Sequence, residues 1–254
     1  MKSTEILNYR VSGNGHPVVF LHGFLESKSM WRYLDFTDNI LAIQVDLPGH
    51  GAAINLETER SSMLEMAKYT KHLIETAMDG KLSNYALVGH SMGGYVGLEL
   101  MKLDPNCDKV ILLNSNFWAD NTQKKQDRKR VADIVQKNKK LFLYEAIPNL
   151  FYHPEEHTKE VQSLIKEAME IPAQAIADVS IAMSQREDNS DLVRKRADDI
   201  CIIQGSEDAI VPVELTKSAI DTTQARYVEV KGSGHMAHIE QPEAVIRIIQ
   251  DLLK

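Results

Sequence analysis

The chain has 254 residues, of which 43% are hydrophobic and 26% charged, and its formal net charge at pH 7 is −7. This length suits one α/β domain with an insertion or two small domains, and the composition is that of an ordinary globular protein. The negative charge argues against nucleic acid as the main partner, because phosphate binding requires clustered positive charge. No stretch approaches the roughly 18 apolar residues of a membrane span, so we expect no membrane insertion.

Strand and helix patterns alternate through the first part of the chain, which implies a parallel sheet with helices on both faces. A turn signal (Ser-Gly-Asn-Gly) follows the first strand candidate. The strands are expected over residues 6–10, 17–21, 40–45, 85–89 and 109–113, most of them as continuous apolar runs. The helices are expected within residues 31–38 and over 61–78 and 92–103.

The pattern changes at Asn116, and from there to about Arg196 no segment has a convincing strand pattern. Amphipathic spacing in this stretch predicts helices at 121–138, 139–147, 155–170 and 172–185. The alternation then returns with a strand at 200–204, a helix at 212–221, a strand at 226–230 and a helix at 242–252. We interpret the helical block as an insertion, with a core domain of residues 1–116 and 197–254 and a helical cap of residues 117–196.

One stretch runs against the overall charge. Residues 124–130 read Lys-Lys-Gln-Asp-Arg-Lys-Arg, and Lys137, Lys139 and Lys140 follow. Charged residues interleaved at helical spacing are typical of a solvated helix face, and we expect that here.

A serine stands alone on the bend between a predicted strand and a predicted helix, in the sequence Gly-His-Ser-Met-Gly of residues 89–93. The pattern G-x-S-x-G is typical of a nucleophile elbow, in which the serine takes a strained backbone conformation. Side chains at Gly89 or Gly93 would collide with neighbouring backbone there. Because this spacing also occurs by chance in loops, the interpretation requires an acid, a histidine and an oxyanion loop elsewhere in the chain.

Three further motifs follow predicted strands, at the edge where open parallel sheets bind ligands. They are His-Gly-Phe at 22–24, Gly-Ser-Glu-Asp at 205–208 and Gly-Ser-Gly-His at 232–235. The resulting order of Ser91, Asp208 and His235 along the chain is the order expected of an α/β-hydrolase triad.

Together with Asp-Leu-Pro-Gly-His-Gly at 46–51, these motifs span positions 22 to 235. On them the chain resembles the α/β-hydrolase superfamily, and within it the esterase-like group with a helical cap. The resemblance implies an α/β fold, the α/β-hydrolase fold, with a mostly parallel sheet of about seven to eight strands, helices on both faces and a helical cap insertion.

The resemblance also implies the roles of the site residues. Ser91 is the nucleophile, His235 the base that takes its proton, and Asp208 the acid that holds the imidazole. The backbone N–H groups of Phe24 and Met92 are the expected donors of the oxyanion hole. We expect the substrate pocket between the sheet edge and the cap, with candidate lining residues Leu25, Phe117, Trp118, Phe142, Phe151, Ile210, Val211 and Met236.

Neighbouring residues offer rival assignments. Glu207 adjoins Asp208, and His238 follows His235 and is expected at the start of the last helix. In some relatives the acid instead follows the strand before the cap, where this chain has Asn114 and Ser115, neither of which can serve as a carboxylate. We expect structural roles for His22, Asp46 and His90.

A serine nucleophile excludes the branches of the superfamily that use aspartate. We predict hydrolysis of a small carboxylic ester or thioester through an acyl-enzyme, with no cofactor and no metal, by a cytoplasmic monomer or homodimer. One alternative is a cofactor-free lyase or a carbon–carbon bond hydrolase, which would need charged cap residues aimed at an anionic substrate. Arg186, Arg194 and Arg196 are available, although we expect them on solvated helix faces. The other alternative is a ligand receptor or regulator with weak hydrolase activity.

Overall fold

A computed structural model describes residues 8–36, 39–59, 61–81 and 84–254, and these form one seven-stranded sheet with the order β1-β3-β2-β4-β5-β6-β7. β1 pairs with β3 in the antiparallel direction, and the other neighbouring pairs are parallel. The strands are β1 Tyr9–Gly13, β2 His16–Leu21, β3 Ile40–Val45, β4 Tyr85–His90, β5 Cys107–Leu113, β6 Ile200–Gly205 and β7 Arg226–Val230. The predicted fold class is therefore confirmed.

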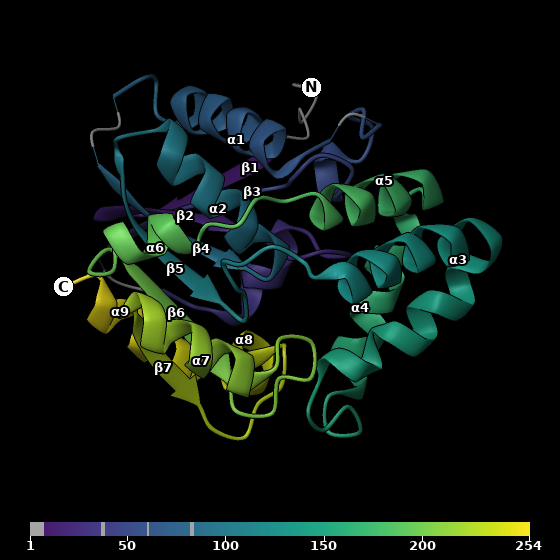
Figure 1. The fold of residues 1–254 in the computed structure, drawn as a ribbon. Coiled ribbons are helices and arrows are strands. Elements are labelled where there is room, and N and C mark those ends of the chain that lie inside the picture. Colours follow the sequence, from purple (N-terminus) through teal and green to yellow (C-terminus); the bar gives the residue numbers. More distant parts are fainter. Residues whose placement is uncertain (1–7, 37–38, 60, 82–83) are drawn as a thin grey trace.

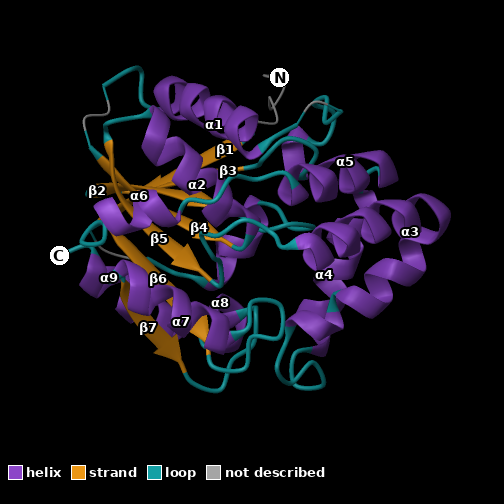
Figure 2. Ribbon diagram, in the orientation of Figure 1, coloured by secondary structure: helices purple, strands orange, loops and turns teal. Residues whose placement is uncertain are grey.

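Helices cover both faces of this sheet (Figures 1 and 2). The α-helices are α1 Met63–Ala77, α2 Met92–Leu103, α3 Thr122–Ala146, α4 Thr158–Glu170, α5 Ala173–Ser184, α6 Ser190–Lys195, α7 Val213–Thr223, α8 Ala237–Glu240 and α9 Pro242–Leu252. Short 3₁₀ helices are η1 Lys28–Tyr33, η2 Gly51–Ala53 and η3 Pro148–Leu150.

The alternation of side chains along each strand builds two separate core layers. In β2, Val19 and Leu21 pack with α1 and α2 on one face, whereas Val18 and Phe20 pack with η1 and α9 on the other. All four side chains are fully buried. Since successive strand residues point to opposite faces, a continuous apolar run produces a strand covered on both sides.

The helices α3, α4 and α5 lie together beside the sheet, on the right in Figure 1. They follow β5 and precede β6, and their apolar side chains form a third cluster with Leu25, Met236 and Ile239 of the core segments. The two helices predicted at 121–138 and 139–147 are a single element, α3, interrupted at Asn138, whose φ of −154° and ψ of 73° are not helical. The short helix α6 was not predicted.

Two predicted elements are displaced in the structure, and one residue lies in a different helix from the one expected. The strand expected at 6–10 is β1, which begins at Tyr9; residues 6 and 7 lie outside the described residues. The helix expected within 31–38 is η1, which begins earlier because the Ser27 side chain caps it by accepting from the Ser29 N–H; residues 37 and 38 lie outside the described residues. His238 lies in the separate helix α8, not at the start of α9, because Gln241 with φ of −138° separates the two helices.

Among the described residues, no helix is both long and apolar enough to cross a lipid bilayer.

Candidate active site

Ser91 occupies the bend between β4 and α2 with φ of 48° and ψ of −113°, a conformation that non-glycine residues rarely adopt. The two flanking glycines allow the close approach that this bend requires. A Cβ on Gly89 would lie 2.4 Å from the carbonyl oxygen of Gly93, and a Cβ on Gly93 would lie 2.3 Å from that of Leu21. The glycines therefore fill positions where backbone atoms leave no room for a side chain.

The structure brings Ser91, His235 and Asp208 together from three separate loops. The Ser91 Oγ lies 3.0 Å from the His235 Nε2, and the His235 Nδ1 lies 3.0 Å from each carboxylate oxygen of Asp208. An Nδ1–H that donates to Asp208 leaves the Nε2 lone pair directed at the serine hydroxyl. This is the geometry that a base needs to take the serine proton.

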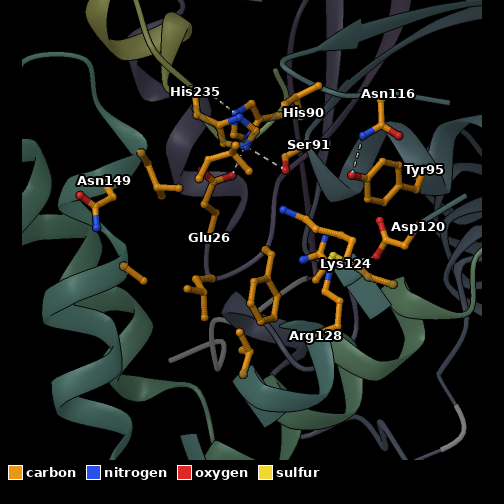
Figure 3. Close-up of a pocket in the computed structure, with 18 of the residues that line it drawn as sticks. Glu26, His90, Ser91, Tyr95, Asn116, Asp120, Lys124, Arg128, Asn149 and His235 are labelled. Carbon is orange, nitrogen blue, oxygen red and sulfur yellow. Dashed lines mark hydrogen bonds and ion pairs between the residues drawn. The ribbon is translucent and has the colours of Figure 1, made fainter. Parts of the chain in front are cut away.

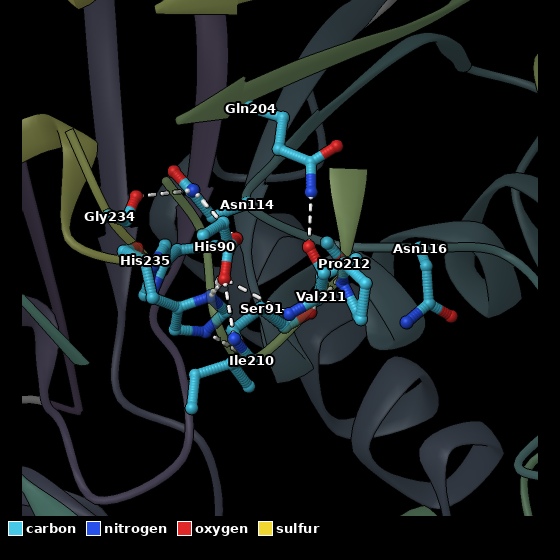
Figure 4. A network of polar contacts seen from close by, with 12 residues as sticks. His90, Ser91, Asn114, Asn116, Gln204, Ile210, Val211, Pro212, Gly234 and His235 are labelled. Carbon is cyan, nitrogen blue, oxygen red and sulfur yellow. Dashed lines mark hydrogen bonds and ion pairs between the residues drawn. The ribbon is translucent and has the colours of Figure 1, made fainter. Parts of the chain in front are cut away.

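Further hydrogen bonds hold the Asp208 carboxylate in place, and their donors Asn114, Ile210 and Val211 are labelled in Figure 4. It accepts from the Asn114 side chain at 2.9 Å and from the backbone N–H groups of Ile210 and Val211 at 2.9 and 3.0 Å. Burial alone would raise the pKa of Asp208, but the charge of His235 and these donors lower it below its ordinary value. The carboxylate therefore stays ionised beside the imidazole. Asn114, which follows β5, contributes an amide to the acid at Asp208.

Glu26 and His90 form a buried pair beneath this bend. Glu26 Oε2 lies 2.9 Å from the His90 Nδ1 and accepts from the Gly23 N–H at 2.6 Å, while the His90 Nε2 donates to the His235 carbonyl at 2.9 Å. Burial would raise the pKa of Glu26, but the charge of His90 lowers it to about 2. The pair thus connects the loop after β2 with the loop that carries His235. His90 has the structural contacts expected of it.

The loop after β2 is held on both sides of Phe24. The N–H of Gly23 is bonded to Glu26, and the N–H of Leu25 donates to the His50 Nε2 at 3.4 Å. Met92 is the first residue of α2, a position at which a helix supplies no carbonyl for the backbone N–H. Both N–H groups expected at an oxyanion hole therefore belong to fixed segments next to Ser91.

Other expected structural residues fix the same loops. His22 accepts from the Leu47 N–H at 2.9 Å, and Asp46 accepts from the backbone N–H groups of Lys28 and Ala52 at 2.7 and 2.9 Å. Lys28 and Asp46 also form an ion pair. These contacts agree with the loop-fixing roles predicted for His22 and Asp46.

A cavity of about 320 Å³ opens in front of Ser91 and His235 (Figure 3). Part of its wall is apolar, and it includes Phe24 and the predicted lining residues Leu25, Phe142, Ile210 and Val211. Polar and charged side chains form the rest: Glu26, His90, Tyr95, Asn116, Asp120, Lys124, Arg128 and Asn149. No group of three or more His, Cys, Asp or Glu side chains in the described parts of the chain is arranged to hold a metal ion.

A profile of the alpha/beta hydrolase family matches residues 18–248. The chain belongs to this family. It is 23% identical over 256 residues to the pyrrolizixenacetamide deacetylase of Xenorhabdus hominickii, covering 97% of this chain and 94% of the relative. It is also similar to solved structures of two esterases. One is a thermophilic esterase from Thermogutta terrifontis, with a TM-score of 0.87, 26% identity and coverage of 96% of this chain and 92% of that chain. The other is from Exiguobacterium antarcticum, with a TM-score of 0.83, 22% identity and coverage of 97% and 95%.

Four of the apolar residues predicted to line the pocket of this hydrolase do not line the cavity. Phe117 is 2% exposed and packs with the sheet, with its ring 5.3 Å from that of Trp118, which is partly buried against the same cluster. Phe151 stacks on His157, and Met236 is completely buried in the third cluster. Each of these side chains packs with an apolar core cluster, and none of the four is among the residues that line the cavity.

Two residues of the basic stretch also lie elsewhere than the sequence patterns predicted. Lys124 and Arg128, expected on a solvated face, line the cavity, while Lys125 and Lys129 on the same helix are exposed. The available signal was their spacing, because residues four apart share one face of a helix.

Arg186 was likewise expected on a solvated helix face, but it is buried. It forms an ion pair with Asp120 at 2.7 Å, and its guanidinium lies 4.1 Å from the centre of the Tyr95 ring. Arg194 and Arg196 pair instead with the nearby carboxylates of Asp191 and Asp199.

Acidification is expected to destabilise the hydrolase through His50. Its Nδ1 donates to the Pro48 carbonyl and its Nε2 accepts from Leu25, so the contacts require a neutral ring. Burial and the nearby His22 lower the pKa of His50 to about 3. As the pH falls below about 6.5, His50 therefore takes up a proton in the unfolded chain but stays neutral in the folded chain. Between pH 6.5 and 5 this costs about 2 kcal/mol of unfolding free energy.

Urea unfolding at pH 7.5, 6 and 5 measures this effect. His50→Gln is expected to be less stable than the wild type at pH 7.5 but to lose less stability on acidification. The comparison between the two proteins is needed because other groups contribute their own slopes. Against burial, the Glu26 charge raises the pKa of His90, which therefore stabilises the fold below pH 6.5 and loses that contribution as the pH rises. Parallel curves for wild type and variant would contradict the assignment to His50.

Proposed function

We propose that the protein is a serine hydrolase that cleaves small carboxylic esters or thioesters through an acyl-enzyme. The observation that carries this proposal is the contact of 3.0 Å between the Ser91 Oγ and the Nε2 of His235, whose Nδ1 is bonded to Asp208. Membership of the alpha/beta hydrolase family and the similarity to esterase structures support the same reaction class.

In the proposed reaction, His235 takes the proton of Ser91 as the hydroxyl attacks the ester carbonyl, and then gives it to the departing alcohol or thiol. Asp208 stabilises the imidazolium that forms between these steps. The N–H groups of Phe24 and Met92 donate to the oxyanion of the tetrahedral intermediate. Water, activated by His235, then hydrolyses the acyl-serine by the same sequence and restores the enzyme.

We further propose that residues 117–196 act as a cap over this site. Lys124, Arg128 and Phe142 of α3 line the same cavity as Ser91, and apolar side chains of α3, α4 and α5 pack against Leu25 and Met236 of the core segments. A roof of this kind would exclude water from the ester and select its size.

Labelling with a fluorophosphonate, combined with a panel of p-nitrophenyl esters of rising chain length, tests the proposal. We expect one phosphonate group per chain, located at Ser91 by peptide mass spectrometry, and turnover of the shorter esters. Labelling without multiple turnovers would favour a ligand receptor or regulator instead, and labelling elsewhere would contradict the role of Ser91.

A second candidate function is a cofactor-free lyase or a carbon–carbon bond hydrolase that uses the same serine. Lys124 and Arg128 in the cavity wall favour keeping it, because such reactions need cap cations that face an anionic substrate. Turnover of an anionic substrate through its carbon–carbon bond, by a protein that is labelled at Ser91 but hydrolyses no ester in the panel, would favour this candidate over the ligand receptor.

A further inference from the structure

The cap side of the cavity carries more positive than negative charge. α3 places Lys124 and Arg128 one helical turn apart, and both extend into the space near Ser91 in Figure 3. Asp120, just before this helix, is the one carboxylate that the described residues provide on this side of the cavity. The hydrogen bonds and ion pairs of these three side chains show whether the positive charges of Lys124 and Arg128 are already neutralised by carboxylates of the protein.

Asp120 is fully engaged by two arginines. Its Oδ2 accepts from the Arg128 Nε at 3.3 Å, and its Oδ1 from the Arg186 Nη1 at 2.7 Å. The other carboxylate of the cavity wall, Glu26, is committed to His90 and to the Gly23 N–H. Neither carboxylate is left to neutralise a further cation.

Lys124 has no such partner, since its ammonium group forms no hydrogen bond or ion pair with any described residue. Partial burial and the nearby Arg128 lower the pKa of Lys124 more than the charges of Asp120 and Asp127 raise it. Asp120 offsets one of the three charges of Lys124, Arg128 and Arg186. The cluster of Lys124, Arg128, Arg186 and Asp120 therefore keeps a surplus of positive charge, and the same cavity also has apolar lining residues such as Leu25 and Phe142.

We propose that Lys124 and Arg128 form a carboxylate-binding subsite, so that the preferred substrate is an ester that also carries a carboxylate. This inference rests on the proposed ester hydrolysis at Ser91. The ammonium of Lys124 donates to the carboxylate, and the guanidinium of Arg128 adds the N–H groups that Asp120 does not use. The apolar wall contacts the carbon chain between the carboxylate and the ester. Lys124 and Arg128 are thus specificity-determining residues.

Two pairs of esters test the subsite, each pair differing in one carboxylate. Mono-p-nitrophenyl adipate against p-nitrophenyl hexanoate places the charge on the acyl side, and 4-acetoxybenzoate against methyl 4-acetoxybenzoate places it on the alcohol side. In at least one pair, the wild type is expected to have the higher kcat/KM for the anionic member. Lys124→Met is expected to lower that value by about tenfold or more, the effect of losing one charge-assisted hydrogen bond, and to change the neutral member by about twofold or less.

Lys125→Met is the matched control, because it removes the same charge from the next position of α3, where the side chain is exposed. It is expected to leave the ratio of anionic to neutral turnover as in the wild type. Arg128→Gln is expected to lower the ratio as Lys124→Met does. Equal ratios in the wild type, Lys124→Met and Lys125→Met for both pairs would overturn the subsite.

Binding to the Ser91→Ala protein separates this inference from the proposed function. Isothermal titration with the same esters is expected to give tighter binding of the anionic member, and Lys124→Met in the same background is expected to remove the preference. Equal affinities for both members of both pairs would overturn the subsite even if the wild type hydrolyses esters. A wild type that binds anionic esters selectively but turns none over would instead overturn the ester hydrolysis and leave the subsite standing.

Discussion

Replacing Ser91 with alanine is expected to lower kcat for ester hydrolysis by about 10⁴- to 10⁶-fold, the range found when the nucleophile of a serine triad is removed. The Ser91 Oγ is the atom that would form the acyl-enzyme, and it lies 3.0 Å from the His235 Nε2. Without it, the remaining groups can only orient a water molecule. The fold should not change, since alanine fits the same bend and loses one partly exposed hydroxyl.

Hydrolysis of p-nitrophenyl acetate by the purified proteins measures this effect, and circular dichroism with thermal unfolding checks the fold. Ser206→Ala is a suitable control, because Ser206 lies in the loop after β6 and its hydroxyl contacts Glu207 and the Gly232 N–H rather than His235. It is expected to retain wild-type turnover. Full activity of a folded Ser91→Ala protein would refute the nucleophile assignment.

The second large effect is expected from Asp208→Asn, with a loss of about 10⁴-fold in kcat. The Asp208 carboxylate accepts hydrogen bonds from Asn114, from two backbone N–H groups and from the His235 Nδ1. The side-chain amide of asparagine would point its own N–H group at one or more of these donors. It would also favour the His235 tautomer that carries the proton on Nε2. That tautomer cannot take the serine proton, so the geometry remains while the base is lost.

Glu207→Gln supplies the matched control for this prediction. Glu207 adjoins Asp208 but is exposed, and its carboxylate contacts the Ser206 hydroxyl at 3.1 Å. We expect kcat values close to the wild type for Glu207→Gln, measured with the same ester across pH 6 to 9. Unchanged turnover in Asp208→Asn, or a large loss in Glu207→Gln, would move the acid to another residue.

Local patterns were sufficient wherever a short segment fixes its own conformation. The apolar runs at 17–21 and 40–45 correspond to β2 and β3, and the expected helix at 92–103 coincides with α2. Gly89 and Gly93 marked the bend at Ser91 because backbone atoms within about 2.4 Å would exclude any side chain there. The break between two predicted helices at Asn138 was also visible, although the structure merges them into one element.

The sequence by itself thus determined the fold class, the family resemblance and the loops that carry Ser91, Asp208 and His235. These properties follow from residue types at fixed spacing, and parallel strands necessarily bring the loops at their carboxyl ends to one edge of the sheet.

Only the tertiary structure decided which side chains face the cavity. Lys124 and Arg128 belong to a charged stretch that the sequence patterns placed on a solvated helix face. They line the cavity because apolar side chains of α3 pack with Leu25 and Met236 of the core segments. Phe117 and Met236 were expected to line the pocket, but they pack into the core. Periodicity defines a face of a helix or strand, whereas the partner of that face is set by contacts between segments far apart in the chain.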